Sequence, residues 1–217
     1  MKTIYLWVNS EGWESFDFDA PETKQALIDR HITIGHYAKI GDSAKIGDSA
    51  KIGDSAEIGY YAEIGDYAEI GDYAEIGYSA KIGDYAEIGY YAEIGDYAEI
   101  GDSAKIGDSA EIGDYAEIGD YAEIGDYAEI GYSAKIGYYA EIGDKEIILK
   151  TLFITGTKHT VIWWGKGIIN IGCHKKEISW WLENGVAVAE RENYSPEQIE
   201  EYRQYVIICD LLQKSIK

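Results

Sequence analysis

The sequence has little of what marks a secreted, disulfide-rich or membrane-spanning protein. Of its 217 residues only two are cysteine, Cys173 and Cys209, and two are proline. Two cysteines are too few for a disulfide framework and are typical of a reducing compartment. No run of about 18 apolar residues occurs, which excludes a spanning helix, and residues 1–13 lack the apolar core of a signal peptide. We therefore expect a cytoplasmic protein that does not associate with membranes.

Positive charge is also scarce. Lysine and arginine number 19 against 40 aspartate and glutamate, which gives a formal net charge of -21 at pH 7. Residues 34–141 contain 6 Lys, 12 Asp and 12 Glu, so their net charge of -18 accounts for most of this excess. Such a surface repels nucleic acid and anionic membranes. The composition therefore excludes direct nucleic-acid binding through this segment and predicts that any protein partner has a basic surface.

The sequence is rich in one six-residue unit. Nineteen Ile-Gly pairs follow one another at six-residue spacing from Ile34 to Ile142, without an insertion. Within a unit, Ala-Glu-Ile alternates like a strand of about three residues. Gly-Asp-Tyr or Gly-Asp-Ser supplies a turn, in which we expect glycine to take a positive φ. Because so short a strand cannot bury its apolar side alone, the units are expected to stack as a solenoid.

The pattern Ile-Gly-x-x-Ala-x resembles the hexapeptide repeat of left-handed parallel β-helices. This resemblance covers 108 of the 217 residues. It implies triangular coils of three hexads each, with isoleucine and alanine pointing inward and forming ladders from coil to coil. Eighteen complete hexads then form about six coils. The expected fold class is an all-β solenoid of this type.

The segments on either side of the repeat differ from it in composition and are predicted to be caps. Residues 1–33 form a strand and a helix, residues 34–144 the β-helix, and residues 145–217 a small α+β capping module. Residues 163–185 and the segment after them also resemble a C-terminal module that follows repeat tracts in bacterial and phage proteins of unassigned function. The predicted strands are 1–8, 146–154, 159–164 and 167–173, and the predicted helices are 21–31, 175–185 and 195–216.

Two sets of outward side chains are candidate interaction surfaces. Five glutamates repeat at 18-residue spacing on one face, where stacked like charges repel each other. The column is either retained by selection for a function or present by chance, and we favour chance. The corners carry 16 of the 20 tyrosines, which either shield the corners by stacking, as we favour, or form an aromatic contact surface. The glutamates are Glu57, Glu75, Glu93, Glu111 and Glu129, and the paired tyrosines are Tyr60, Tyr61, Tyr90, Tyr91, Tyr138 and Tyr139.

Candidate catalytic groups are few. Many hexapeptide β-helix proteins are acyltransferases, and the resemblance implies a histidine base in the coils or on a loop that projects from them. His36 is the only histidine in the repeat, and no loop interrupts the coils. Cys173 and His174 have no second Cys/His pair near them, so we expect no metal site. The tryptophan pairs 163–164 and 180–181 are expected to build the core of the C-terminal module.

These features favour a non-enzymatic acidic scaffold or protein-interaction module, phage or mobile-element encoded, that needs no cofactor. A more specific version of this hypothesis is mimicry of DNA. A charge of -18 spread over about 29 Å gives an axial charge spacing close to the ~1.7 Å spacing of the duplex. The alternative is a hexapeptide-repeat acyltransferase that uses acyl-CoA, with His159, His174 or His36 as its base. The identity of a partner and the oligomeric state stay open, and a homo-oligomer is compatible with the sequence.

Overall fold

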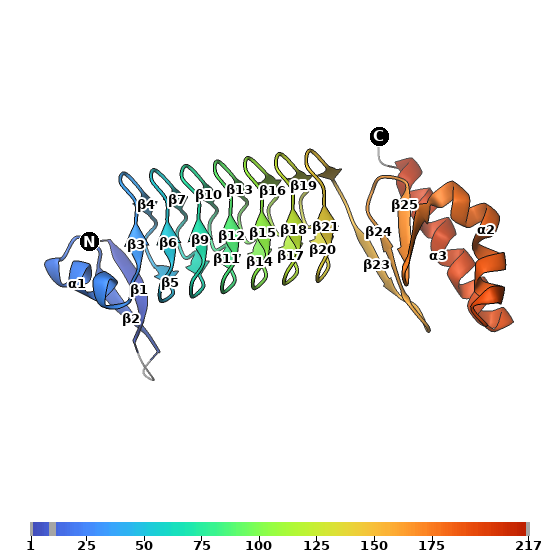
Figure 1. The fold of residues 1–217 in the computed structure, drawn as a ribbon, viewed down its shortest axis with the longest axis horizontal. Helices are drawn as coiled ribbons and strands as arrows, with labels where there is room; N and C mark the ends of the chain where they lie inside the picture. The colour runs from blue at the N-terminus through green and yellow to red at the C-terminus, as the bar shows by residue number, and fades with distance from the viewer. Residues whose placement is uncertain (1, 9–11, 216–217) are drawn as a thin grey trace. The chain divides into compact units, whose positions relative to one another are not determined.

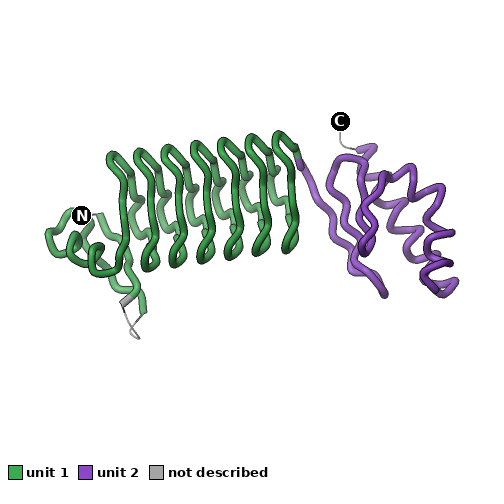
Figure 2. Tube along the Cα trace, viewed as in Figure 1, with its two compact units in different colours: residues 1–147 green, residues 148–217 purple. Residues whose placement is uncertain are grey.

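The computed structural model describes residues 2–8 and 12–215. It divides into two compact units, Met1–Ile147 and Ile148–Lys217 (Figure 2). The finer division at residues 33 and 144, based on composition, stays a prediction. None of the helices in the described part of the chain combines the length and apolar character that crossing a bilayer requires.

The first unit is a β-solenoid in which each hexad contributes one short strand and one corner (Figure 1). Most strands span two residues, since only the charged residue and the isoleucine after it form the ladder. They are β3 (Thr33–Ile34), β4 (Lys39–Ile40), β5 (Ala44–Ile46), β6 (Lys51–Ile52), β7 (Glu57–Ile58), β8 (Glu63–Ile64), β9 (Glu69–Ile70), β10 (Glu75–Ile76), β11 (Lys81–Ile82), β12 (Glu87–Ile88), β13 (Glu93–Ile94), β14 (Glu99–Ile100), β15 (Lys105–Ile106), β16 (Glu111–Ile112), β17 (Glu117–Ile118), β18 (Glu123–Ile124), β19 (Glu129–Ile130), β20 (Lys135–Ile136), β21 (Glu141–Ile142) and β22 (Ile147–Ile148).

Three parallel sheets form the sides of the solenoid. Their strand orders are β5-β8-β11-β14-β17-β20, extended at its start by β1 and β2, then β22-β19-β16-β13-β10-β7-β4, and β21-β18-β15-β12-β9-β6-β3. Each strand pairs with the strand 18 residues away, as Glu75 does with Glu93 and Ile76 with Ile94. Three hexads therefore make one coil, and the expected solenoid of about six coils is confirmed.

The core of the solenoid consists of stacked isoleucine and alanine side chains. From Ile40 to Ile136 every repeat isoleucine is at most 3% exposed, and every alanine between them is at most 1% exposed. Burial of an isoleucine side chain contributes about 1.5–3 kcal/mol relative to its exposure. Because each hexad contributes the same two residues, this term recurs in every coil.

The conformation of the corners differs from the expectation. The repeat glycines have no positive φ; the third residue of each Gly-Asp-Tyr or Gly-Asp-Ser triplet has it instead, with φ 57° at Tyr97 and 56° at Ser103. Glycine is needed for another reason. A Cβ placed at Gly95 would lie 2.5 Å from the amide nitrogen and Oδ1 of Asp114 in the next coil. That Oδ1 accepts a hydrogen bond of 2.9 Å from the Asp96 amide, so glycine lets the coils approach and aspartate joins them.

The N-terminal segment continues one sheet of the solenoid. β1 (Thr3–Val8) pairs in parallel with β5, and Ile4 and Leu6 of β1 are fully buried. β2 (Gly12–Asp17), which the sequence analysis missed, pairs antiparallel with β1. The helix α1 (Pro21–Asp29) follows. The expected strand and helix are therefore present, although Met1 lies outside the described residues.

The second unit contains a four-stranded antiparallel sheet and two helices. Its strands, in sheet order, are β23 (Leu152–Thr155), β24 (Thr160–Trp163), β25 (Ile168–Ile171) and β26 (His174–Glu177). The helices are α2 (Ile178–Arg191) and α3 (Pro196–Ser215), which lie side by side (Figure 1). The expectation of three strands was wrong, because residues 174–177 form a fourth strand before α2 begins. Ile216, the last residue of the expected second helix, lies outside the described residues.

The core of the second unit lies between the sheet and the helices. Trp163 and Trp181 are 2% and 5% exposed and pack with buried aliphatic residues of β24, β25 and α3. The Trp181 indole also donates a hydrogen bond of 3.0 Å to the Ile169 carbonyl. At the start of α3, the Ser195 amide donates to Gln198 Oε1 at 2.9 Å and the Gln198 amide donates to Ser195 Oγ at 3.3 Å. This capping box fixes the beginning of the helix.

Candidate functional site

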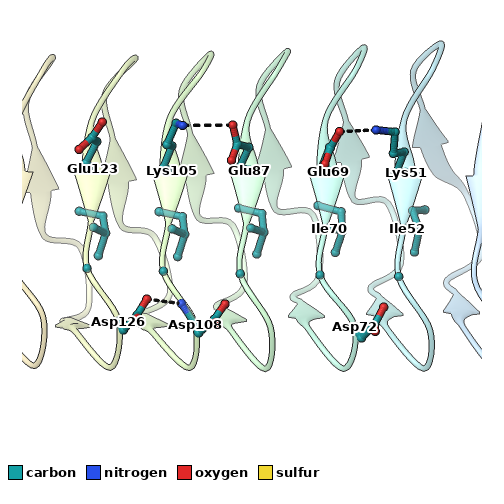
Figure 3. A pocket seen from close by; sticks show the side chains of 18 of the residues that line it. Lys51, Ile52, Glu69, Ile70, Asp72, Glu87, Lys105, Asp108, Glu123 and Asp126 are labelled. Atoms are coloured by element: carbon teal, nitrogen blue, oxygen red, sulfur yellow. Dashed lines mark hydrogen bonds and ion pairs between the residues drawn. The ribbon is translucent and has the colours of Figure 1, made fainter.

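The outward faces of the solenoid carry columns of exposed charges. On the face shown in Figure 3, Lys105 pairs with Glu87 at 3.3 Å, and Lys51 is bound to Glu69. The Asp108 amide donates to Asp126 Oδ1 at 2.9 Å on the corner beside it. All these charged groups are already paired with others of the same face, and none is an imidazole or a thiol. The face therefore offers no base for proton transfer near neutral pH.

The predicted glutamate column exists as a geometric feature. Glu57, Glu75, Glu93, Glu111 and Glu129 occupy five successive strands of one sheet in register. Lys39, one strand earlier, is bound to Glu57. Glu75, Glu93 and Glu111 have carboxylates above and below them in the column, whereas Glu129 has Glu111 on one side and β22 on the other. Whether a protein with a basic surface binds this face stays a prediction.

The corner tyrosines form short ladders of rings. Tyr73 stacks on Tyr91 with ring centroids 4.8 Å apart, and Tyr121 stacks on Tyr139 at 5.0 Å. Tyr90 and Tyr138 pack edge-on against these stacks, at 4.5 Å from Tyr91 and 4.2 Å from Tyr139. Tyr60 and Tyr61 are 59% and 53% exposed, and Tyr61 packs edge-on against Tyr78. The rings thus stack along the corners, while leaving part of each face in contact with solvent.

Two of the corner phenols, those of Tyr90 and Tyr138, are not poised to ionise. Desolvation by neighbouring groups raises the pKa of Tyr90, and the hydrogen bond with Tyr139 raises the pKa of Tyr138. Both phenols therefore stay neutral at physiological pH and are unsuited to act as bases. His36, the only histidine of the repeat, lies exposed on the first corner, where its backbone amide donates to Asp54 Oδ1 at 2.7 Å. No projecting loop of the described coils surrounds it.

A cavity with different chemistry lies within the second unit. Its volume is about 500 Å³, and its walls come from β25, β26, α2, α3 and the turn before β24. Most of the wall is aliphatic and comes from the two helices, including Leu182, Val186, Val188, Ile199, Val206 and Ile207. His159, Cys173, His174, Tyr194 and Tyr202 also line it. The cavity therefore combines an apolar wall with two imidazoles, a thiol and two phenols.

His159 is positioned by contacts between α3 and the turn before β24. The Tyr202 hydroxyl accepts hydrogen bonds from the amides of Lys158, at 2.9 Å, and His159, and it donates to the His159 carbonyl at 2.7 Å. Glu201 accepts from the Thr157 amide at 2.9 Å and from its hydroxyl at 2.6 Å. The Thr157 hydrogen bond lowers the pKa of Glu201, so this carboxylate stays ionised and the turn stays attached to the helix near neutral pH.

His174 reaches the same cavity from the next hairpin. Gly172, with φ 58°, forms the tight turn between β25 and β26, and His174 is the first residue of β26. A Cβ at Gly172 would lie 3.3 Å from the His159 ring, so the ring packs against this turn. The half-buried His174 ring contacts Trp181 edge-on, with centroids 6.4 Å apart. The fold therefore brings to one cavity two of the three histidines considered from the sequence, and it leaves out His36.

Among the residues at 2–8 and 12–215, no three His, Cys, Asp or Glu side chains come together in a way that would hold a metal ion. Within the same ranges, neither imidazole ring of the cavity forms a hydrogen bond with another residue. Their ring nitrogens are thus available to a bound molecule. This arrangement suits proton transfer next to an apolar group.

The two cysteines are expected to differ in reactivity. Cys173 is exposed at the cavity, whereas Cys209 is fully buried and its burial raises the pKa of the thiol to about 11. Because the thiolate is the reactive form, an aromatic disulfide reagent at pH 8 should modify Cys173 in the folded protein and Cys209 only after denaturation. Mass spectrometry should therefore find one modified thiol, then two. Rapid modification of both in the folded state would contradict the burial of Cys209.

Comparison with known proteins identifies the repeat. The family model described as "Bacterial transferase hexapeptide (six repeats)" matches residues 61–96 and 91–126. No curated protein matches the sequence.

Solved structures resemble the chain in fold. It is similar to a variant of GDP-perosamine N-acetyltransferase from Caulobacter crescentus in complex with CoA and GDP-perosamine, with 18% identity, a TM-score of 0.50 and 59% of each chain covered. It is also similar to a putative acetyltransferase from Bacillus cereus, with 18% identity, a TM-score of 0.48, and 85% of this chain and 89% of that chain covered. The acetyltransferase domain of PglB from Neisseria gonorrhoeae FA1090 has 17% identity, a TM-score of 0.47, and coverage of 49% and 51%. The chain thus spans about half to three fifths of the length of two of these proteins.

The family match corrects the expectation about function. The interpretation as a non-enzymatic acidic scaffold, with DNA-like charge mimicry as its sharper form, was wrong, because the model that fits the repeat describes transferases. The expectation that the protein is not an enzyme was wrong for the same reason. An acidic surface also keeps a protein soluble, so it does not by itself indicate a binding function. The chain is a hexapeptide-repeat protein whose first unit is a left-handed parallel β-helix.

Proposed function

We propose that the protein is an acyltransferase that uses an acyl-CoA donor, and that the cavity of the second unit is its catalytic site. The observation that carries the proposal is the presence of two imidazoles, His159 and His174, in a cavity whose wall is mainly aliphatic. The match of the repeat to a transferase model supports the reaction class. The described coils contribute one imidazole, that of His36, which lies exposed on the first corner and outside this cavity.

The reaction requires a base that takes a proton from the acceptor. We assign this role to His174, because its ring is half-buried against Trp181, whereas His159 is exposed. As the acceptor hydroxyl or amine attacks the thioester carbonyl, His174 takes the proton that the acceptor loses. The new ester or amide bond forms, the carbon–sulfur bond breaks, and CoA leaves as the thiol after taking up a proton.

The charge of the second unit also suits an anionic donor. Residues 148–217 carry nine Lys and Arg against eight Asp and Glu, whereas residues 1–147 carry 10 against 32. The net charges are therefore +1 and -22. An anionic CoA thioester is repelled by the first unit and much less by the second. The same proposal places the enzyme in the cytoplasm, where the exposed Cys173 thiol stays reduced.

The test is a search for acceptor-dependent release of CoA by the full-length protein. Acetyl-CoA and octanoyl-CoA are each incubated with a panel of hydroxyl and amine acceptors, and free CoA is measured by chromatography, since a thiol reagent would also label Cys173. We expect release that requires an acceptor, together with a product whose mass has increased by that of the acyl group. If folded protein releases no CoA with any acceptor, the proposal is wrong.

A further inference from the structure

The cavity of the second unit is a pocket with a mainly apolar wall that opens to the surface, where Leu182 and Val186 are 50% and 45% exposed. The volume here is about 500 Å³, and side chains such as Val188 and Val206 form its wall. This volume lies within the range of roughly 300–1,000 Å³ that is typical of ligand pockets. An acetyl group would fill only a small part of it.

Gly185 is a second, independent observation that indicates a ligand in the cavity. It lies inside α2, where glycine destabilises a helix relative to alanine. Packing does not require glycine there, because a Cβ would meet only Trp181 Cε3 at 3.5 Å, an ordinary van der Waals distance. Gly185 lines the cavity one helical turn after Trp181. The missing side chain therefore enlarges the cavity and serves no evident structural purpose.

The arrangement of polar and apolar groups points to one class of ligand. The aliphatic wall suits a hydrocarbon chain, while the two imidazoles suit a carbonyl group. Charges of both signs lie at the cavity: Arg203, which pairs with Glu200 at 3.2 Å, and Glu192, which pairs with Arg191 at 3.2 Å. Because each of these charges is already paired within the protein, neither requires an opposite charge on the ligand.

We infer that this cavity binds an unbranched acyl chain of medium length, with its carbonyl end near His159 and His174 and its chain in the space beside Gly185. The chain is carried either by a free fatty acid or by an acyl thioester. Its role as the transferred group rests on the proposed function, whereas its binding does not. Gly185 is then the residue that sets the longest chain accepted.

Calorimetric titration of the full-length protein tests the binding. Two series are used, the fatty acids from butyrate to decanoate and the corresponding acyl-CoA thioesters, all below their micellar concentrations. Burial of each added methylene is expected to raise the affinity about fourfold until the cavity is full. The thioester series should bind more tightly if CoA is the carrier, and the acid series if the ligand is a free fatty acid. Affinity that does not change with chain length in either series would overturn the inference.

A pair of leucine substitutions separates the cavity from the rest of α2. Gly185→Leu places a side chain in the cavity and should weaken decanoyl binding at least tenfold, with little effect on butyryl binding. Ala187→Leu adds an alkyl group at an exposed position of the same helix that does not line the cavity, and it should bind every chain as the wild type does. Leucine is a better helix former than glycine, so both variants should keep the wild-type melting temperature or exceed it. Unchanged decanoyl binding by folded Gly185→Leu would overturn the inference.

Binding and transfer can fail separately. Chain-length-dependent binding without CoA release would support the acyl-chain site and contradict the proposed reaction. Acceptor-dependent transfer at the same kcat/KM for acetyl-CoA and octanoyl-CoA, with the same rates in Gly185→Leu, supports the reaction and overturns the chain site.

Discussion

Replacing Gly95 with alanine is expected to destabilise the solenoid by about 3 kcal/mol, at the upper end of the usual cost of overpacking. The new Cβ would lie 2.5 Å from two atoms of Asp114 and 2.7 Å from the Gly113 carbonyl carbon. Most of these are backbone atoms of the next coil, which cannot move without lengthening the ladder between Gly95 and Ile112, a hydrogen bond of 2.7 Å. Urea unfolding followed by far-ultraviolet circular dichroism measures the loss as a lower midpoint.

Gly143→Ala is the matched control. Gly143 holds the same place in its hexad, but a Cβ there would contact only Glu146 Cγ, at 3.6 Å. We expect its unfolding midpoint to stay close to that of the wild type. If both variants lost the same stability, the backbone freedom of glycine and not the approach of the coils would explain the residue at this position.

Replacing His174 with glutamine is expected to lower kcat for acyl transfer by about 10²–10⁴-fold, the contribution typical of a positioned general base. Glutamine keeps a side chain that can form hydrogen bonds but cannot take up the acceptor proton. Because the aliphatic wall of the cavity is unchanged, KM for acyl-CoA should change little. Initial rates of acceptor-dependent CoA release measure both constants.

Two further histidine variants serve as controls for this result. His36→Gln, on an exposed corner of the first coil, should transfer acyl groups at the wild-type rate. His159→Gln should retain more activity than His174→Gln, since the exposed His159 ring packs against the Gly172 turn and is not assigned the proton transfer. Full activity of a folded His174→Gln variant would rule out this residue as the base, and loss of activity in His36→Gln alone would place the site on the repeat.

The repeat is the part of the structure that the sequence predicts best. The positions of Ile94 and Ala98 within the hexad were enough to assign both to the core, because only one stacking of a three-residue strand buries them. The corner was predicted less well. Glycine was expected to take the positive φ, but the next coil leaves no space for a Cβ at Gly95, and Tyr97 takes the left-handed conformation instead. Such contacts between coils cannot be seen in a single hexad.

The candidate site was only partly accessible to sequence analysis. His159 and His174 were noted, yet nothing in their spacing indicates that two hairpin turns bring them to one cavity. Residues 174–177 read His-Lys-Lys-Glu, and because three of the four are exposed, they lack the apolar alternation that would have predicted a strand. Gly185 was taken as the end of a helix that in fact continues to Arg191. The signal that sequence analysis missed was a glycine inside an otherwise amphipathic helix.

The register of 18 residues has a consequence for how the tract can change in length. Between Ile40 and Ile136 every hexad places the same isoleucine and alanine in the core, so recombination between repeated codons that removes or adds any whole number of hexads preserves the ladders. The outward residues are not equivalent in this way. Loss of one hexad moves every later lysine and glutamate to the neighbouring side of the prism, whereas loss of three returns each to its own side. The core is therefore unchanged by the number of hexads. The surface charge pattern of a length variant is preserved only when the number of hexads gained or lost is a multiple of three.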